Sequence, residues 1–180
     1  MEVARWASKL QASGVVAFGM GGDELSLPTV NFRPAFDFAR GEGLHLVCHA
    51  GEIGDAENVR EAVELLGAER IGHGIAAVSD PSLMEHLKAH DIPLEICITS
   101  NLVTGVVKRL EDHPVRRLFE AGVPITLATD DPAMFACTLT DEYRLAAAKL
   151  GFSQAELEAI AENGFRYAFD PSAAGNQLVR

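Results

Sequence analysis

Five short apolar segments, each followed by polar or glycine residues, constrain the fold of this chain most strongly. They cover residues 15–20, 44–48, 70–72, 94–98 and 125–129. Each segment is too short for a stable helix and is flanked by Gly or Pro, which is typical of buried strands. Because the segments are apolar almost throughout, they predict strands of a parallel sheet that is covered on both faces.

Amphipathic stretches alternate with these strands and predict helices. The predicted helices cover residues 3–12, 57–66, 81–90, 112–120, 139–150 and 154–168. Strands and helices that alternate about every 25–30 residues indicate an α/β protein built from βαβ units. Two architectures have this pattern: an open doubly wound sheet and part of a (β/α)8 barrel. A complete barrel needs about 250 residues, and the chain has 180, so length favours the open sheet.

The charge and cysteine content narrow the possible partners and the cellular location. The chain has 15 Lys and Arg against 26 Asp and Glu, a formal net charge of −11. Nucleic-acid phosphates and anionic membranes repel such a chain, so we expect neither as a partner. The first residues lack a signal-peptide core. The three cysteines, Cys48, Cys97 and Cys137, form no Cys-x-x-Cys pair, so we expect a reduced, cytoplasmic protein.

Polar residues follow every predicted strand. They are Gly21–Glu24, His49–Glu52, His73 with Gly74, Thr99–Asn101, and Asp130 with Asp131. In parallel α/β proteins the carboxyl ends of the strands meet at one rim, where active sites are built. Two histidines, a glutamate and two aspartates would therefore converge, and such a set could hold a divalent metal and supply acid and base groups.

Several of these residues also have structural interpretations. Asp131 precedes Pro132, which is typical of a helix start. By contrast, Asp130 follows a strand, where a buried unpaired carboxylate would be costly, and His73 between two glycines is a poor core residue. The remaining histidines beside helices, among them His113, are expected to be solvated, and Cys48 and Cys97 are expected to be core thiols.

Five motifs then carry a resemblance to a known family. They are GGDE at residues 21–24, HAGE at 49–52, RIGHG at 70–74, TSN at 99–101 followed by Thr104 and Gly105, and TDDPAMF at 129–135. In this order and spacing they resemble the adenosine deaminase family of metal-dependent hydrolases, over essentially the whole chain. The resemblance implies an incomplete (β/α)8 barrel in place of the open sheet. It would comprise about the last five β/α units and the C-terminal helices, as a single domain over residues 1–180 that lacks the N-terminal units.

The resemblance also implies a reaction, the zinc-dependent hydrolytic deamination of a purine nucleoside. Adenosine or 2′-deoxyadenosine would give inosine and ammonia, with adenine or aminofutalosine as further possible substrates. His49 and Asp130 correspond to zinc ligands. Glu52 corresponds to the acid that protonates purine N1, and this role requires a raised pKa.

Three more residues receive roles from the resemblance. His73 corresponds to the group that takes a proton from the zinc-activated water and orients that water. Asp131 corresponds to an acceptor for the same water or for purine N7. The backbone N–H of Gly22 corresponds to a donor to purine N3.

One family feature is missing. The family carries an H-x-H pair that supplies two more zinc ligands, and this sequence contains no H-x-H. Zinc sites normally have at least three protein ligands. We therefore expect a fragment of a longer enzyme. Two alternatives stay open: a separate chain that supplies the N-terminal units, and a non-catalytic α/β remnant that binds a purine or a partner.

Overall fold

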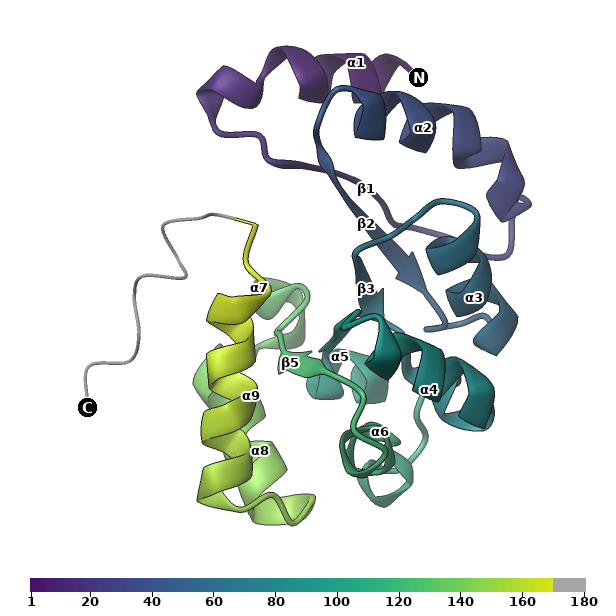
Figure 1. Cartoon of the computed structure of the whole chain (residues 1–180). Helices are drawn as coiled ribbons and strands as arrows, with labels where there is room; N and C mark the ends of the chain where they lie inside the picture. Colours follow the sequence, from purple (N-terminus) through teal and green to yellow (C-terminus); the bar gives the residue numbers. More distant parts are fainter. Residues whose placement is uncertain (170–180) are drawn as a thin grey trace.

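A five-stranded parallel sheet forms the centre of the computed structural model (Figure 1), which describes residues 1–169. The strands are β1 (Ala17–Met20), β2 (His45–Ala50), β3 (Arg70–His73), β4 (Leu94–Ile96) and β5 (Ile125–Leu127). Their spatial order is β1-β2-β3-β4-β5, and all neighbours are parallel. The register pairs Met20 with Cys48 and Ala50 with His73, so β2 and β3 end at the same level and β1 ends two residues earlier.

The strand order decides between the two architectures. In a doubly wound sheet the order reverses at a switch point, whereas in a (β/α)8 barrel each strand pairs with the next strand of the chain. This sheet follows the chain order throughout, so it has the arrangement of five successive barrel units. The preference for an open sheet, which rested on length, is therefore wrong, and the barrel expected from the family resemblance is confirmed as a partial barrel.

The helices cover one side of the strands and connect their ends. The longer ones are α1 (Glu2–Lys9), α2 (Arg33–Gly41), α3 (Ala56–Glu64), α4 (Pro81–Ala89), α6 (Val115–Glu120), α8 (Leu139–Lys149) and α9 (Gln154–Arg166). Two short helices, α5 (Ile98–Val103) and α7 (Pro132–Phe135), lie at the carboxyl ends of β4 and β5. Helical turns of the 3-10 type are η1 (Gln11–Ser13), η2 (Thr29–Phe32), η3 (Ile75–Ser79) and η4 (Leu110–Asp112). Helices α2, α3 and α4 lie along one side of β1–β3 (Figure 1).

The hydrophobic core lies between the strands and these helices. Its largest fully buried side chains include Phe36, Leu46, Ile71, Leu94 and Ile125. They come from α2 and from strands β2 to β5, so one continuous core extends along the sheet. This core fixes the backbone from which the polar side chains at the strand ends project.

The outermost strands of the described sheet are β1 and β5, each paired on one side only. Near β1, Ala4 is the only buried residue of helix α1. The side chains of Val3 and Trp6 on this helix are 62% and 55% exposed. Beyond β5, Met134 of α7 is 74% exposed. Exposed apolar side chains therefore lie near both edge strands, and on β5 the carbonyl oxygen of Ile125 accepts a 2.9 Å hydrogen bond from Nδ2 of Asn163 in α9.

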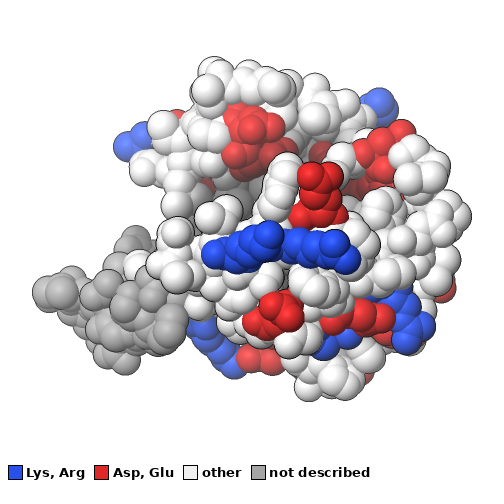
Figure 2. All heavy atoms as spheres, turned by 90° about the horizontal axis from the view of Figure 1, so that it is seen from above, with Lys and Arg blue, Asp and Glu red and all other residues white. Residues whose placement is uncertain are grey.

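The hydropathy of the helices and the charges on one face describe the surface of the molecule. None of the helices between residues 1 and 169 combines the length and hydropathy that crossing a bilayer requires. On the face in Figure 2, basic side chains form a short band across the middle, and acidic side chains lie on either side of it.

Candidate active site at the carboxyl ends of the strands

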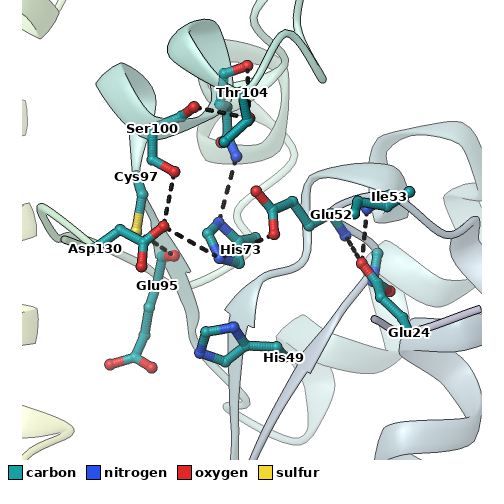
Figure 3. Close-up of polar contacts among 12 residues, drawn as sticks. Glu24, His49, Glu52, Ile53, His73, Glu95, Cys97, Ser100, Thr104 and Asp130 are labelled. Atoms are coloured by element: carbon teal, nitrogen blue, oxygen red, sulfur yellow. Dashed lines mark hydrogen bonds and ion pairs between the residues drawn. The ribbon is translucent and has the colours of Figure 1, made fainter. Parts of the chain in front are cut away.

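Four of the predicted site residues converge at the carboxyl ends of the strands (Figure 3). His49 lies near the end of β2, Glu52 follows β2, His73 ends β3, and Asp130 follows β5. The Nε2 atom of His73 lies 3.4 Å from Oε2 of Glu52 and 4.0 Å from Oδ2 of Asp130. The His49 and His73 rings are 5.0 Å apart and nearly perpendicular. The expected convergence of two histidines with two carboxylates is therefore present.

The backbone is strained at two of these residues. His73 and Asp130 have φ angles of 61° and 57°, in the left-handed region that non-glycine residues avoid. Such conformations cost on the order of 1–3 kcal/mol each and persist only where the surroundings hold them. The two strained residues bring their side chains together, with Nε2 of His73 4.0 Å from Oδ2 of Asp130 (Figure 3).

Asp130 is held by a short helix that the sequence pattern did not reveal. The predicted strand at 94–98 ends at Ile96, and α5 begins at Ile98. From this helix, Ser100 Oγ donates a 2.7 Å hydrogen bond to Oδ2 of Asp130. The helix start is fixed by Glu142 of α8, a fully buried carboxylate that accepts from the backbone N–H of Ile98 at 2.8 Å. A negative charge at a helix N-terminus is favourable because unpaired N–H groups point toward it.

Glu24 is a site residue that the sequence analysis missed, although it belongs to the GGDE motif. Its carboxylate accepts hydrogen bonds from three successive backbone N–H groups, those of Gly51, Glu52 and Ile53, at 2.5, 2.8 and 2.7 Å. Since Gly22 and Glu24 share one loop, these bonds tie the Gly22 loop to the loop that carries Glu52. Gly22, Glu24 and His49 together line a cavity of about 190 Å³.

Burial and neighbouring charges shift the pKa values of Glu52 and His73 in opposite directions. Burial, followed by the charges of Asp130 and Glu24, raises the pKa of Glu52 above its ordinary value. Burial, followed by the neighbouring His49, lowers the pKa of His73. A carboxyl group with a raised pKa retains a proton more readily and is suited to act as an acid. A raised pKa of Glu52 is the direction that the acid role implied by the family resemblance requires.

Glycine is required beside His49. A Cβ atom at Gly72 would lie 2.6 Å from Cδ2 of His49, far inside van der Waals contact. The His49 ring therefore lies directly over the backbone of the neighbouring strand β3, and Gly72 leaves the space for it.

The donor set for a metal is incomplete within the described residues. His49 and Asp130 carry the imidazole and carboxylate groups that Zn²⁺ prefers. Residues 1–169 contain no group of three or more His, Cys, Asp or Glu placed to hold a metal ion. By themselves these residues do not make a zinc site, which requires at least three protein ligands.

The remaining predicted site residues lie at the margins of this cluster. Gly22 lines the cavity with His49. Asp131 precedes α7, which has Pro132 in its first turn as the sequence predicted, but the Asp131 carboxylate makes no capping hydrogen bond. The exposed Asp131 side chain is therefore not committed to the helix start.

One histidine was placed wrongly from the sequence. His113 was expected to be solvated, but it is only 4% exposed and its Nε2 lies 3.3 Å from Oδ1 of Asn101. The predicted helix over residues 112–120 does not begin there, because η4 ends at Asp112 and α6 begins at Val115. His113 lies in the break between them and points inward.

Comparison with known proteins places this geometry in a family. The family model described as "Adenosine deaminase" matches residues 1–180. The aminodeoxyfutalosine deaminase of Streptomyces coelicolor is 45% identical over 170 residues, which cover 93% of this chain and 44% of that protein. The adenosine deaminase of Shewanella loihica is 46% identical over 155 residues, 86% of this chain and 47% of that protein.

Two solved structures share the fold. The adenine deaminase from Arthrobacter aurescens matches with a TM-score of 0.87 and 31% identity, over 97% of this chain and 55% of that one. An amidohydrolase from Burkholderia ambifaria with bound zinc matches with a TM-score of 0.83 and 27% identity, over 97% and 50%. The chain thus spans about half the length of the relatives that it matches. With the family model matched over its whole length and the strand-end residues converging as expected, the chain belongs to the adenosine deaminase family.

Proposed function

We propose that this chain carries the purine-recognising and proton-transferring part of an active site for the hydrolytic deamination of a purine nucleoside. The observation that carries the proposal is the meeting of Glu52, His73 and Asp130 within 3.4 to 4.0 Å at the strand ends. The raised pKa of Glu52 supports an acid role for this carboxyl group. We propose that residues 1–180 act as one domain in the cytoplasm.

The proposed reaction consumes one water molecule. Glu52 donates a proton to purine N1, which draws electron density from C6 and makes that carbon electrophilic. Water adds to C6, and one of its protons passes to the amino nitrogen, which leaves as ammonia when its bond to C6 breaks. The other water proton returns to the Glu52 carboxylate as C6 becomes a carbonyl carbon. His73 contacts the attacking water through Nε2, and Asp131 accepts a hydrogen bond from that water or lies near N7. The backbone N–H of Gly22 donates to N3 and so orients the base.

A zinc ion is part of the proposal, with His49 and Asp130 as two of its donors. Bound zinc would supply a water molecule of lowered pKa and polarise it. The remaining donors would come from polypeptide that pairs with the edges of β1 and β5, in the same or a separate chain. The one-sided strand pairing of β1 and β5 and the exposed Val3 and Trp6 support such pairing.

The substrate is proposed from the relatives. Adenosine and 2′-deoxyadenosine come first, because several of the matching relatives are named adenosine deaminase. Three of them are 42% to 46% identical to this chain. An aminodeoxyfutalosine deaminase is equally similar, at 45%. Aminofutalosine derivatives and adenine are therefore the alternatives to assay.

A second candidate function is a non-catalytic module that binds a purine or a partner chain. The observation that favours it is the donor set, because residues 1–169 offer no group of three ligands for a metal. In this case Gly22 and Glu52 would still contact the base, but no ammonia would be released.

Zinc content and ammonia release distinguish the two candidates. The chain is purified with zinc, freed of loose metal and assayed with adenosine, adenine and aminodeoxyfutalosine, alone and with the N-terminal half of a relative. About one retained zinc per site, and ammonia release that the Glu52→Gln variant abolishes, would support the deaminase. Purine binding by the folded chain without zinc or ammonia under both conditions would support the binding module.

A further inference from the structure

A buried line of polar groups connects the start of α6 to His73. The backbone N–H of Val115 donates to Nδ1 of His113 at 3.2 Å. Nε2 of His113 lies 3.3 Å from Oδ1 of Asn101, and Nδ2 of Asn101 lies 3.3 Å from Nδ1 of His73. The three side chains are 4%, 0% and 2% exposed, in that order. Buried polar groups of this kind are costly unless each is satisfied, so the line forms one hydrogen-bonded unit.

The first hydrogen bond sets the direction of all the others. A backbone N–H can only donate, so Nδ1 of His113 must accept. A neutral His113 ring then has its proton on Nε2. Burial lowers the pKa of His113 to about 4, so the ring is neutral near pH 7. Its Nε2–H donates to Oδ1 of Asn101, which leaves the amide nitrogen of Asn101 facing His73.

The same reasoning carries the direction to the active site. An amide nitrogen is a donor without an acceptor lone pair, so Nδ1 of His73 accepts from Asn101. We propose that His113 and Asn101 are positioning residues that fix the proton of neutral His73 on Nε2, the ring nitrogen that faces Glu52 and Asp130. Nε2 is the atom 3.4 Å from Oε2 of Glu52 and 4.0 Å from Oδ2 of Asp130.

This assignment specifies how His73 acts in the proposed reaction. A ring nitrogen that bears the proton has no lone pair there, so neutral His73 donates a hydrogen bond at Nε2. It orients the water in this state and does not abstract a proton from it, which differs from the role that the family resemblance implied. The meaning for catalysis rests on the proposed function, whereas the position of the proton is a property of the fold alone.

Nitrogen NMR of the histidine rings tests the assignment directly. In the metal-free full chain with ¹⁵N-labelled histidine, long-range proton–nitrogen correlations distinguish a protonated ring nitrogen from an unprotonated one. We expect His73 to show a protonated Nε2 and an unprotonated Nδ1 near neutral pH. His90, whose Nδ1 lies 2.9 Å from the carbonyl oxygen of His86, serves as an internal reference. A wild-type spectrum with the proton on Nδ1 of His73 would overturn the proposal.

The line of hydrogen bonds from His113 through Asn101 to His73 is called the relay below. Reversing the hydrogen-bond direction at one of its residues gives the sharper test. In Asn101→Asp, a carboxylate can only accept, so Nδ1 of His73 must carry a proton, whether the ring stays neutral or becomes an imidazolium. Asn31→Asp adds the same charge at an exposed position of η2 and is the matched control, expected to leave the His73 signals unchanged. A folded Asn101→Asp chain that keeps the wild-type pattern would contradict the relay.

A second variant guards against loss of folding in Asn101→Asp. Asn101→Leu removes both polar contacts at similar volume, and His73 should then show a mixture of both ring forms. A single, wild-type ring form in folded Asn101→Leu would also overturn the proposal. Because these signals do not depend on turnover, an inactive chain with the expected spectrum would count against the proposed function and leave the relay supported.

Discussion

Lowering the pH should destabilise this protein through His113. The ring is 4% exposed, and burial lowers its pKa from 6.5 to about 4 in the folded chain. Between these values the unfolded chain binds a proton that the folded chain does not. The contribution of the neutral His113 ring to the free energy of unfolding is therefore complete above the unfolded pKa. This contribution is lost as the pH falls toward the folded pKa. The pKa difference corresponds to about 3 kcal/mol in total, of which about 2 kcal/mol is lost by about pH 5.

Urea unfolding followed by circular dichroism measures this loss. The free energy of unfolding is compared at about pH 7.5 and about pH 5 in the wild type and in His113→Asn. The asparagine oxygen can still accept from the N–H of Val115 but cannot titrate, so this variant should lose about 2 kcal/mol less than the wild type over that interval. His90→Asn, on the exposed end of α4, is the matched control and should keep the wild-type difference.

The contribution of His73 sets a limit on the expected result. Its pKa is also lowered by burial, so His113→Asn should keep part of the acid-dependent loss. Equal losses in the wild type and in His113→Asn would refute the reasoning, because they would mean that the buried His113 ring does not control the stability in this interval.

Three further predictions concern the site. Glu24→Gln removes a charge that raises the pKa of Glu52, so carbon NMR of the Glu52 carboxyl should show a lower titration midpoint; an unchanged or higher midpoint would contradict this. Glu142→Ala leaves buried N–H groups of α5 without an acceptor and should lower the free energy of unfolding in urea by about 2–4 kcal/mol. Glu142→Gln should lower it less. Equal losses in the two variants would argue against a role for the Glu142 carboxylate at the start of α5. Gly72→Ala places a Cβ 2.6 Å from Cδ2 of His49 and should weaken zinc retention, measured by metal analysis, when the chain is combined with the N-terminal half of a relative. Retention at the wild-type level in that complex would argue against His49 as a donor.

The sequence was informative where the determinants are local. The five strands were predicted within a few residues because apolar runs bounded by Gly or Pro reflect the burial of single segments. The polar residues at the strand ends followed from the topology of parallel sheets. His49, His73 and Asp130 could therefore be expected at one rim before their distances were known.

The misses depend on contacts between distant parts of the chain. Glu24 accepts hydrogen bonds from residues 27 to 29 positions away, and no local pattern reports such a contact. His113 precedes Pro114, a combination typical of a solvated helix start. In the structure its ring is buried and contacts Oδ1 of Asn101. Helix α5 was missed because Ile96 and Ile98 continue one apolar run, although Glu142 fixes a helix start between them.

The dependence of α5 on Glu142 has a consequence for the order in which the site forms during synthesis. Residues 1–73 can already pair β1, β2 and β3 and bring Glu24 to the Glu52 loop. Asp130 reaches its position only after β5 has paired with β4. Ser100 of α5 donates a hydrogen bond to Asp130, and the first N–H groups of α5 have their acceptor only once Glu142 of α8 is in place. A ribosome-bound chain that ends before residue 142 should therefore have the glutamate side of the site in place while the aspartate side is still unanchored.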